Sequence, residues 1–247
     1  MFAIAHAYLM EQLFAQPQPM NYLGCVWPDM LFNGPLLHKQ THKEGAQFLA
    51  FILQNAPDLI PFALAVITHG SEPHGFDWFS DEAYDPGAEK GYAFERIRPF
   101  VDEVIAVTHA PPEMGLWKGH NFVEMTFEAQ LSLQYPHLGV AVANACHAPE
   151  LVSRVAEIAA AYFHQPAKAL AENITRFPDT VSLQQPTYAS LAEKYATQLE
   201  LKHGITDADI PGMTALLQKV SDAIAADRDI FLQTSISEVG KTIASYL

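Results

Sequence analysis

The stretch GHNFVEMTFE, residues 119–128, combines a histidine and a glutamate with the pattern of a buried helix. His120 and Glu124 are four residues apart, about one helical turn, so the imidazole and the carboxylate point the same way. Phe127 and Leu131 continue this face as the apolar stripe that contacts a core. Because a buried carboxylate is costly unless it is paired or bound to a metal, the two side chains are either metal ligands or partners in a core hydrogen bond.

A second concentration of chemically active side chains occupies residues 67–82, ITHGSEPHGFDWFSDE. His69 ends a strongly apolar helical pattern, and Glu72, His74 and Asp77 follow it, so that four such side chains fall within nine residues. Packing does not explain this density, and the segment therefore predicts a site. Within it, Asp77 or Glu72 would orient an attacking water molecule as general base.

Two more histidines, His38 and His42, are four residues apart, the spacing at which two imidazoles on a helix reach one ion. His42 is the stronger candidate because it opens a helical pattern. Lys39 and Lys43 flank the pair, so a solvated basic turn is the alternative. The chain has eleven histidines, seven of them in its first half, and histidine is the commonest metal ligand in proteins.

Single candidates precede these motifs. His6 lies on the expected first helix, where a lone histidine is more often structural than a ligand. Asp29 in GCVWPDM has the position of a helix N-cap, but its apolar neighbours also suit a metal-bound carboxylate. Together the motifs supply more imidazoles and carboxylates than one zinc ion needs, which indicates a multinuclear centre. Two or three neighbouring metals polarise a phosphoryl oxygen and generate hydroxide at neutral pH.

The elements that must position these residues are helices. Helical patterns cover residues 2–15, 41–55, 58–69, 93–108, 114–134, 138–146, 149–164, 186–202 and 212–245. Residues 17–37 predict a loop with short helical turns, and residues 70–92 predict a long functional loop. Alternating strand patterns and hairpin turns are missing from the sequence. We therefore expect an all-α, single-domain, multi-helix bundle over residues 1–247, with the candidate ligands in about residues 1–130 and packing helices in about residues 138–247.

Composition excludes several other classes of protein. The chain has 28 acidic and 14 basic residues, a formal net charge of −14, and no basic cluster, so nucleic-acid binding through a basic patch is not expected. No apolar run reaches about 18 residues, so no transmembrane segment is expected. The first residues lack the basic region of a signal peptide, and a cytoplasmic protein is the expectation. Cys25 and Cys146 are too few and too far apart for a disulfide framework.

The order of the motifs resembles that of the zinc-dependent phospholipase C and P1 nuclease superfamily. It is closest to the divergent branch that includes the amino-terminal domain of glycosylphosphatidylinositol-specific phospholipase D. The resemblance covers about residues 1–130, and the matching residues are His6, Asp29 in GCVWPD, His42 in QTH, His69 in AVITH, and His120 and Glu124 in HNFVE. Pro73 stands where the family has an Asp, so Glu72 or Asp77 would replace it, and His74 would stand for a later histidine. The resemblance implies an all-α fold and a trinuclear zinc site.

Two functions are compatible with the sequence. The first is a metal-dependent hydrolase of phosphoric esters, whose substrate is a phospholipid head group, a nucleotide or another small phosphodiester. It would use water activated by one to three divalent ions, zinc or a similar metal. The ligands would be His6, Asp29, His42, His69, His74, His120 and Glu124. The alternative is a non-catalytic helical protein of the same fold with a structural or degenerate metal site. The sequence leaves the oligomeric state open, a homo-oligomer included.

Overall fold

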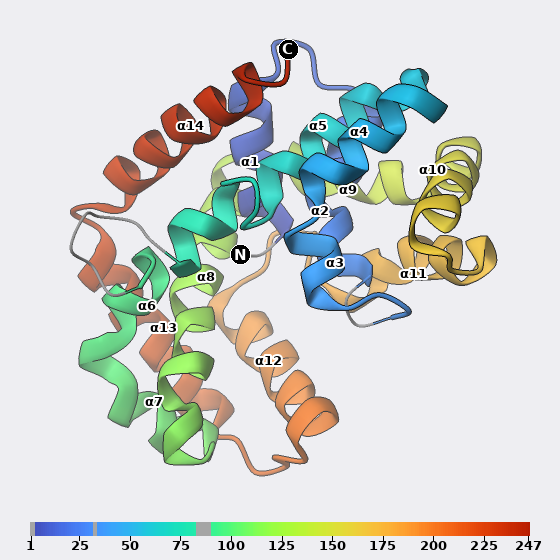
Figure 1. Ribbon diagram of the computed structural model, residues 1–247. Helices are drawn as coiled ribbons and strands as arrows, with labels where there is room; N and C mark the ends of the chain where they lie inside the picture. Colours follow the sequence, from blue (N-terminus) through green and yellow to red (C-terminus); the bar gives the residue numbers. More distant parts are fainter. Residues whose placement is uncertain (1–2, 32–33, 83–89) are drawn as a thin grey trace.

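Helices account for nearly all of the regular structure in the computed structural model, which describes residues 3–31, 34–82 and 90–247 (Figure 1). Over these residues there is no strand, which confirms the all-α prediction. The α-helices are α1 (Ala3–Leu13), α2 (Pro19–Leu31), α3 (His38–His42), α4 (Gly45–Asn55), α5 (Ile60–His69), α6 (Tyr92–Ile97), α7 (Val101–Thr108), α8 (Gly115–Gln134), α9 (His137–Cys146), α10 (Pro149–Phe163), α11 (Ala167–Thr180), α12 (Tyr188–His203), α13 (Ile210–Ile224) and α14 (Arg228–Ala244). Single 3-10 turns precede α5, α7 and α8, and a π-helical turn covers Trp78–Glu82.

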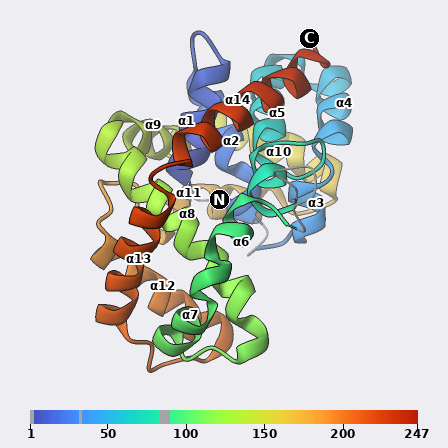
Figure 2. The same cartoon turned by 90° about the vertical axis from the view of Figure 1, so that its left-hand side faces the viewer.

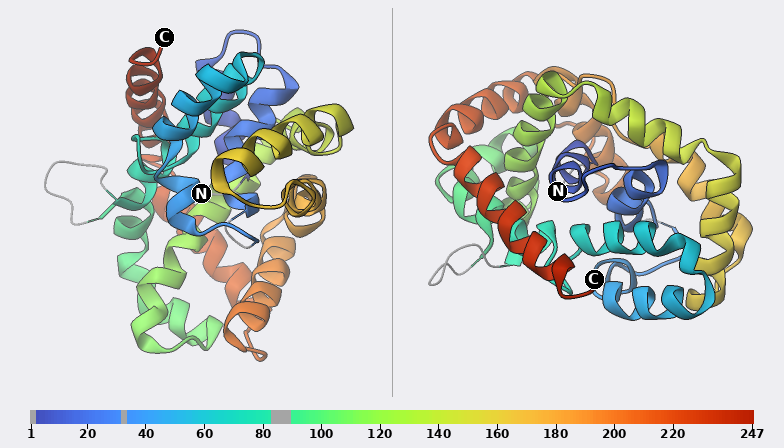
Figure 3. Two further views of the ribbon diagram at one scale, coloured as in Figure 1. Left: turned by 45° about the vertical axis from the view of Figure 1, so that its right-hand side comes forward. Right: turned by 90° about the horizontal axis from the view of Figure 1, so that it is seen from above.

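Helices α1 and α2 lie at the centre of the molecule, and the other helices surround them (Figure 3, right). Helix α1 packs against α2, α8, α9 and α14, and α2 packs against α5, α9 and α11. In the view of Figure 2, α14 crosses in front of α1 and α5, which it contacts. Every side chain of α1 from Ala3 to Met10 is buried, as expected of an almost wholly apolar helix. A histidine within this helix is therefore placed inside the core.

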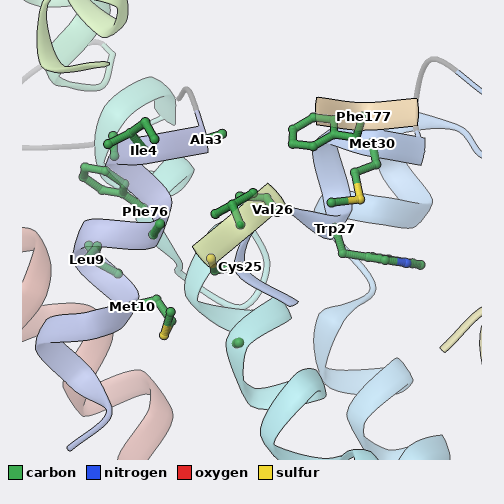
Figure 4. Close-up of a cluster of buried hydrophobic side chains, with 14 of the residues drawn as sticks. Ala3, Ile4, Leu9, Met10, Cys25, Val26, Trp27, Met30, Phe76 and Phe177 are labelled. Carbon is green, nitrogen blue, oxygen red and sulfur yellow. The ribbon is translucent and has the colours of Figure 1, made fainter. Parts of the chain in front are cut away.

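One cluster of buried apolar side chains runs from Ala3 of α1 to Ile243 of α14. Figure 4 shows part of this cluster, in which side chains of α1 and α2 share the interior with Phe76 and Phe177. None of the described helices combines the length and the apolar composition that a membrane span requires. The division of the chain into a ligand-bearing half and a packing half stays a prediction.

Helix α2 corrects the expected loop at residues 17–37. Gly24 and Pro28 made this segment resemble a loop, but burial of Leu23, Val26 and Trp27 stabilises a helix that includes Pro28. Gly24 is required by a close approach of α2 to α5, because a Cβ at this position would lie 2.3 Å from the carbonyl oxygen of Phe62. Tertiary packing has therefore overridden the local turn signals.

Substitution of Gly24 by alanine is expected to destabilise the fold by about 1–3 kcal/mol, the usual cost of overpacking a core. Gly240 in α14 provides a matched control, because the nearest atom to a Cβ there is a flexible Leu13 side-chain carbon at 3.2 Å. Urea unfolding followed by circular dichroism will measure both variants. An unfolding free energy for G24A equal to that of the wild type would contradict the close packing of α2 on α5.

Other boundaries also differ from the prediction. Residues 212–245 form parts of two helices, α13 and α14. Asp227, which lies between them, accepts hydrogen bonds from Tyr92 Oη and Arg96 Nε, both at 2.7 Å. Helix α11 was not predicted, since Pro166 and Pro178 obscured its pattern. Residues 93–108 are divided into α6 and α7 by a 3-10 turn. Within the expected loop at 70–92, residues 70–77 contain no helix longer than a turn. Residues 2, 32–33 and 83–89 of the predicted elements lie outside the described residues.

Candidate metal centre

Five histidine and aspartate side chains meet inside the ring of helices. They come from α1, α2, α3, α5 and the turn after α5, and we call them the central group: His6, Asp29, His42, His69 and Asp77. Ligand atoms of His6, Asp29 and His69 lie within 4.8 Å of one another, as do those of His42, His69 and Asp77. The two triplets share His69, so the five residues form one continuous site.

Within the central group, two carboxylates face the Nε2 atoms of three imidazoles. Asp77 Oδ2 lies 3.3 Å from His69 Nε2 and 3.5 Å from His42 Nε2. Asp29 Oδ1 lies 3.6 Å and 3.4 Å from the same two nitrogen atoms. The other oxygen of Asp77, Oδ1, lies 3.3 Å from His6 Nε2. These contacts link Asp29, His42, His69 and Asp77, which we call the four-residue set. Asp77 also connects this set with His6.

Hydrogen bonds on the opposite side of two rings fix their orientation. His69 Nδ1 donates to the carbonyl oxygen of Cys25 at 2.7 Å, because a carbonyl can only accept. The Thr41 hydroxyl donates to the carbonyl of His38 at 3.2 Å and so accepts from Nδ1 of His42 at 2.7 Å. Each Nε2 then faces the carboxylate oxygens, where it would offer a lone pair to a cation that displaces its proton. Metal-binding histidines are held in this way, with the second nitrogen bonded to a neighbouring group.

Backbone contacts bring α3 against the end of α5. The carbonyl oxygen of His42 accepts hydrogen bonds from the amides of Ser71 and Glu72 at 2.9 and 3.0 Å. Gly70 makes this approach possible, because a Cβ there would lie 2.4 Å from the same carbonyl oxygen. The turn that follows His69 therefore places His42 beside it.

The central group is almost completely enclosed. His6 and His69 are fully buried, His42 and Asp77 nearly so, and only the side chain of Asp29 keeps 24% of its surface exposed. Both ring nitrogens of His6 and Nε2 of His69 are buried and make no hydrogen bond with any described residue. Buried polar atoms without hydrogen bonds cost about 1–3 kcal/mol each, which a bound cation would relieve.

Burial and charge move the pKa values of this group in opposite directions. Burial, together with the charge of His69, lowers the pKa of His6 to about 3. Burial also disfavours a charged His69, but the carboxylates of Asp77 and Asp29 outweigh it and raise the pKa of His69 to about 10. Burial disfavours an ionised Asp29, yet His69 and His42 hold its pKa well below the usual range. The two carboxylates therefore stay ionised, and without a bound cation they favour the protonated form of His69.

A second set of ligand atoms lies on α8 and the π-helical turn, and we call it the lateral group: Asp81, His120 and Glu124. Its ligand atoms lie within 4.8 Å of one another. His120 and Glu124 share one face of α8, as their spacing predicted. Burial, with the negative charges of Asp81 and Asp77 nearby, raises the pKa of Glu124 to about 8. Asp77 directly precedes the π-helical turn that carries Asp81, so the two groups draw ligand atoms from the same short segment.

Local contacts hold the lateral group in place. His120 Nδ1 donates to the carbonyl oxygen of Trp117, and its ring stacks on Phe94 with the ring centres 4.5 Å apart. Ser80 Oγ donates to Glu124 Oε1 at 3.3 Å. Asp81 Oδ1 is buried without a hydrogen-bond partner among the described residues. His120 and Asp81 are only partly buried, so this group is less enclosed than the central one.

Not every candidate from the sequence lies in these groups. Glu72 is exposed and pairs with Lys43 Nζ at 3.2 Å. His74 is also exposed, and its ring stacks on Trp78 with the ring centres 3.8 Å apart. Neither residue contributes an atom to a described ligand group. Asp81 was missed by the sequence reasoning, and its only signal is its position four residues after Asp77.

Two adjacent ligand groups are thus the main chemical feature of the molecule. They contain six of the ligand candidates that the sequence motifs predicted, namely His6, Asp29, His42, His69, His120 and Glu124. Comparison of the chain with protein-family models, with curated proteins and with solved structures gave no match.

Proposed function

We propose that the protein is a metal-dependent hydrolase of phosphoric esters. The observation that carries the proposal is the spacing of the donor atoms in the central group, where each nitrogen lies 3.3–3.6 Å from a carboxylate oxygen. Two ligands of one tetrahedral zinc ion, bonded at about 2.0–2.2 Å, lie about 3.3–3.6 Å apart. A direct hydrogen bond between charged partners would be shorter, about 2.7–2.9 Å. The spacing therefore fits ligands of a shared cation.

The donor atoms of the two groups fall into three sets, which would offer a cation different numbers of ligands. His42, His69, Asp29 and Asp77 would together offer one ion four donors, the number that tetrahedral zinc takes. His6 and the second oxygen of Asp77 would hold part of another. The lateral group offers three protein ligands, the number found at catalytic zinc sites that leave one position for water. Nitrogen and oxygen donors of this kind suit zinc and manganese.

A phosphoester substrate needs positive charge at the site, and bound cations would supply it. The ionised carboxylates of Asp29 and Asp77 would repel a phosphate group from the site. Divalent cations held there would supply positive charge for the phosphoryl oxygens and lower the pKa of a water molecule. Asp29, which is the most exposed residue of the central group, marks the side from which solvent can approach. His120 and Asp81 of the lateral group are only partly buried, so solvent reaches this group, and Ser80 donates a hydrogen bond to the carboxyl of Glu124 there.

A structural metal site is the second candidate. The observation that favours it is the near-complete burial of the four-residue set, since a closed tetrahedral shell is typical of structural zinc. In that case the protein would bind metal without hydrolysing esters. The three-ligand lateral group distinguishes the two functions, because a structural site has no need of an incomplete shell.

Metal analysis and a phosphodiesterase assay test the proposal together. Purified protein is expected to contain zinc or manganese, and to hydrolyse bis(4-nitrophenyl) phosphate with either metal added and not after chelation. Replacement of His120 by alanine should abolish hydrolysis while the four-residue set keeps its ion. Bound metal with no turnover of any diester would support the structural alternative. Absence of metal, with no activity after metal addition, would overturn both.

A further inference from the structure

Glu128 is a buried carboxylate that belongs to neither ligand group. Its side chain is 1% exposed, on α8. Glu128 Oε2 accepts hydrogen bonds from the backbone amides of Ile4 at 2.9 Å and Ala5 at 3.3 Å, and Oε1 accepts from the amide of Ile4 at 3.1 Å. Burial raises the pKa of this carboxyl to about 8, and the two amides oppose that shift. All three hydrogen bonds of this side chain among the described residues therefore come from one short piece of backbone.

That backbone is the first turn of α1. The first amides of a helix have no partner within the helix, and a carboxylate that accepts from them also interacts favourably with the helix dipole. Ile4 and Ala5 directly precede His6. Glu128 therefore fixes the position of the backbone immediately before a residue of the central group.

His6 depends on its helix for its placement more than the other histidines do. His69 is oriented by the carbonyl of Cys25 and His42 by the hydroxyl of Thr41. Neither ring nitrogen of His6 has a hydrogen bond within the part of the chain that the structure describes. Its ring stacks on His69, with the ring centres 3.5 Å apart, and meets the edge of Phe76. Apart from the approach of Nε2 to Asp77 Oδ1 at 3.3 Å, the ring is therefore positioned by its stacking contacts and by the backbone of α1.

Helix α8 connects this anchor with the lateral group. Glu124 and Glu128 are four residues apart on α8 and so lie on the same face. One rigid helix thus presents a candidate ligand of the lateral group and, one turn later, the carboxylate that holds α1. A displacement of α1 relative to α8 would change the distance of His6 from the lateral group and from the other residues of the central group.

We propose that Glu128 is a positioning residue, which holds His6 at the correct distance from Asp77 for the two to bind one cation and keeps that cation in register with the lateral group. This role rests on the proposed function, because it requires that the groups bind metal. Glu128 itself touches neither metal nor substrate.

Cobalt titration of the metal-free protein, followed by visible absorption, tests this role. The H6A variant first identifies the absorption bands that depend on His6 in the central group. The H120A variant identifies the bands that depend on the lateral group. Replacement of Glu128 by glutamine keeps the shape but removes one acceptor. We expect E128Q to weaken the binding step that H6A abolishes by about 10–100-fold, the usual effect of losing an outer support of a metal site. The step that H120A abolishes should keep its affinity.

The matched control is E11Q, which changes the same residue type near the other end of α1. Glu11 accepts from Tyr22 Oη and His137 Nε2 and lies outside both ligand groups. Its cobalt spectrum and affinities should equal those of the wild type. If E128Q fails to fold, hydrogen exchange of the wild type replaces it, and cobalt should slow exchange of the Ile4 and Ala5 amides more than that of α14 amides.

The outcomes separate the two proposals. If the wild type binds cobalt and E128Q binds it with unchanged affinities and spectrum, the positioning role is wrong and the proposed metal site stands. Equal exchange of the Ile4 and Ala5 amides with and without cobalt has the same meaning. If the wild type binds no cobalt, the metal site is wrong and the role of Glu128 falls with it. Selective weakening of the His6-dependent step supports both.

Discussion

Replacement of His69 by alanine is expected to reduce the affinity of the central group for zinc by at least about 100-fold. This loss exceeds the one expected when a residue that only supports a metal ligand is replaced. His69 belongs to both ligand triplets of this group, and its Nε2 faces Asp29 and Asp77. No other described side chain could take its place, because the ring is fully buried and fixed by the carbonyl of Cys25. Isothermal titration calorimetry of the metal-free variant will measure the loss.

The control for this prediction is H147A. His147 is an exposed histidine that follows α9 and belongs to neither group, so its removal should leave zinc affinity unchanged. The H69A variant must also be shown to fold, by its far-ultraviolet circular dichroism in the absence of metal. Wild-type affinity in a folded H69A protein would show that zinc is bound elsewhere.

Saturation with zinc is expected to raise the melting temperature by about 8–16 °C. A ligand that binds only the folded state, at roughly 1,000 times its dissociation constant, stabilises by about 4 kcal/mol. For a chain of about 150–250 residues, each kcal/mol raises the melting temperature by about 2–4 °C. The effect should be large because the cation also relieves the repulsion between Asp29 and Asp77 and satisfies the buried nitrogens of His6 and His69.

Differential scanning calorimetry with and without zinc measures this shift. The same experiment on H69A should show only a small change, which separates binding at the central group from zinc bound at surface histidines. A melting temperature of the wild type that does not respond to saturating zinc would contradict the cation-binding interpretation of the central group.

The fold class could be predicted from sequence because helical periodicity is a local property. The pattern around His120 and Glu124 gave α8 nearly in full, with both side chains on one face. Helix α2 could not be predicted, because its stability comes from burial against α5, which no local pattern records. The hydrogen bonds that Asp227 makes at the break between α13 and α14 likewise involve Tyr92 and Arg96, more than 130 positions earlier.

The candidate site was predictable to the extent that its residues stand in short motifs. His69 was found because it ends an apolar helix, and Asp77 because it lies in a dense polar segment. The same density also pointed to Glu72 and His74, which the turn directs toward solvent. Spacing along an irregular segment does not determine direction, whereas spacing along a helix does. Glu128 has no signal of its own, since its partners are backbone amides.

Gly24 belongs to the residues that position the candidate ligands, although it is not a ligand itself. Gly24 precedes Cys25, whose carbonyl orients His69, and it lets α2, which carries Asp29, lie directly on α5. One methyl group at this position would press α2 away from α5 and so move Asp29 relative to His69. A chain that kept every histidine and aspartate but replaced this glycine would retain the ligand motif with an altered spacing of the donor atoms. Searches for such centres gain specificity when the glycine is included with the ligands.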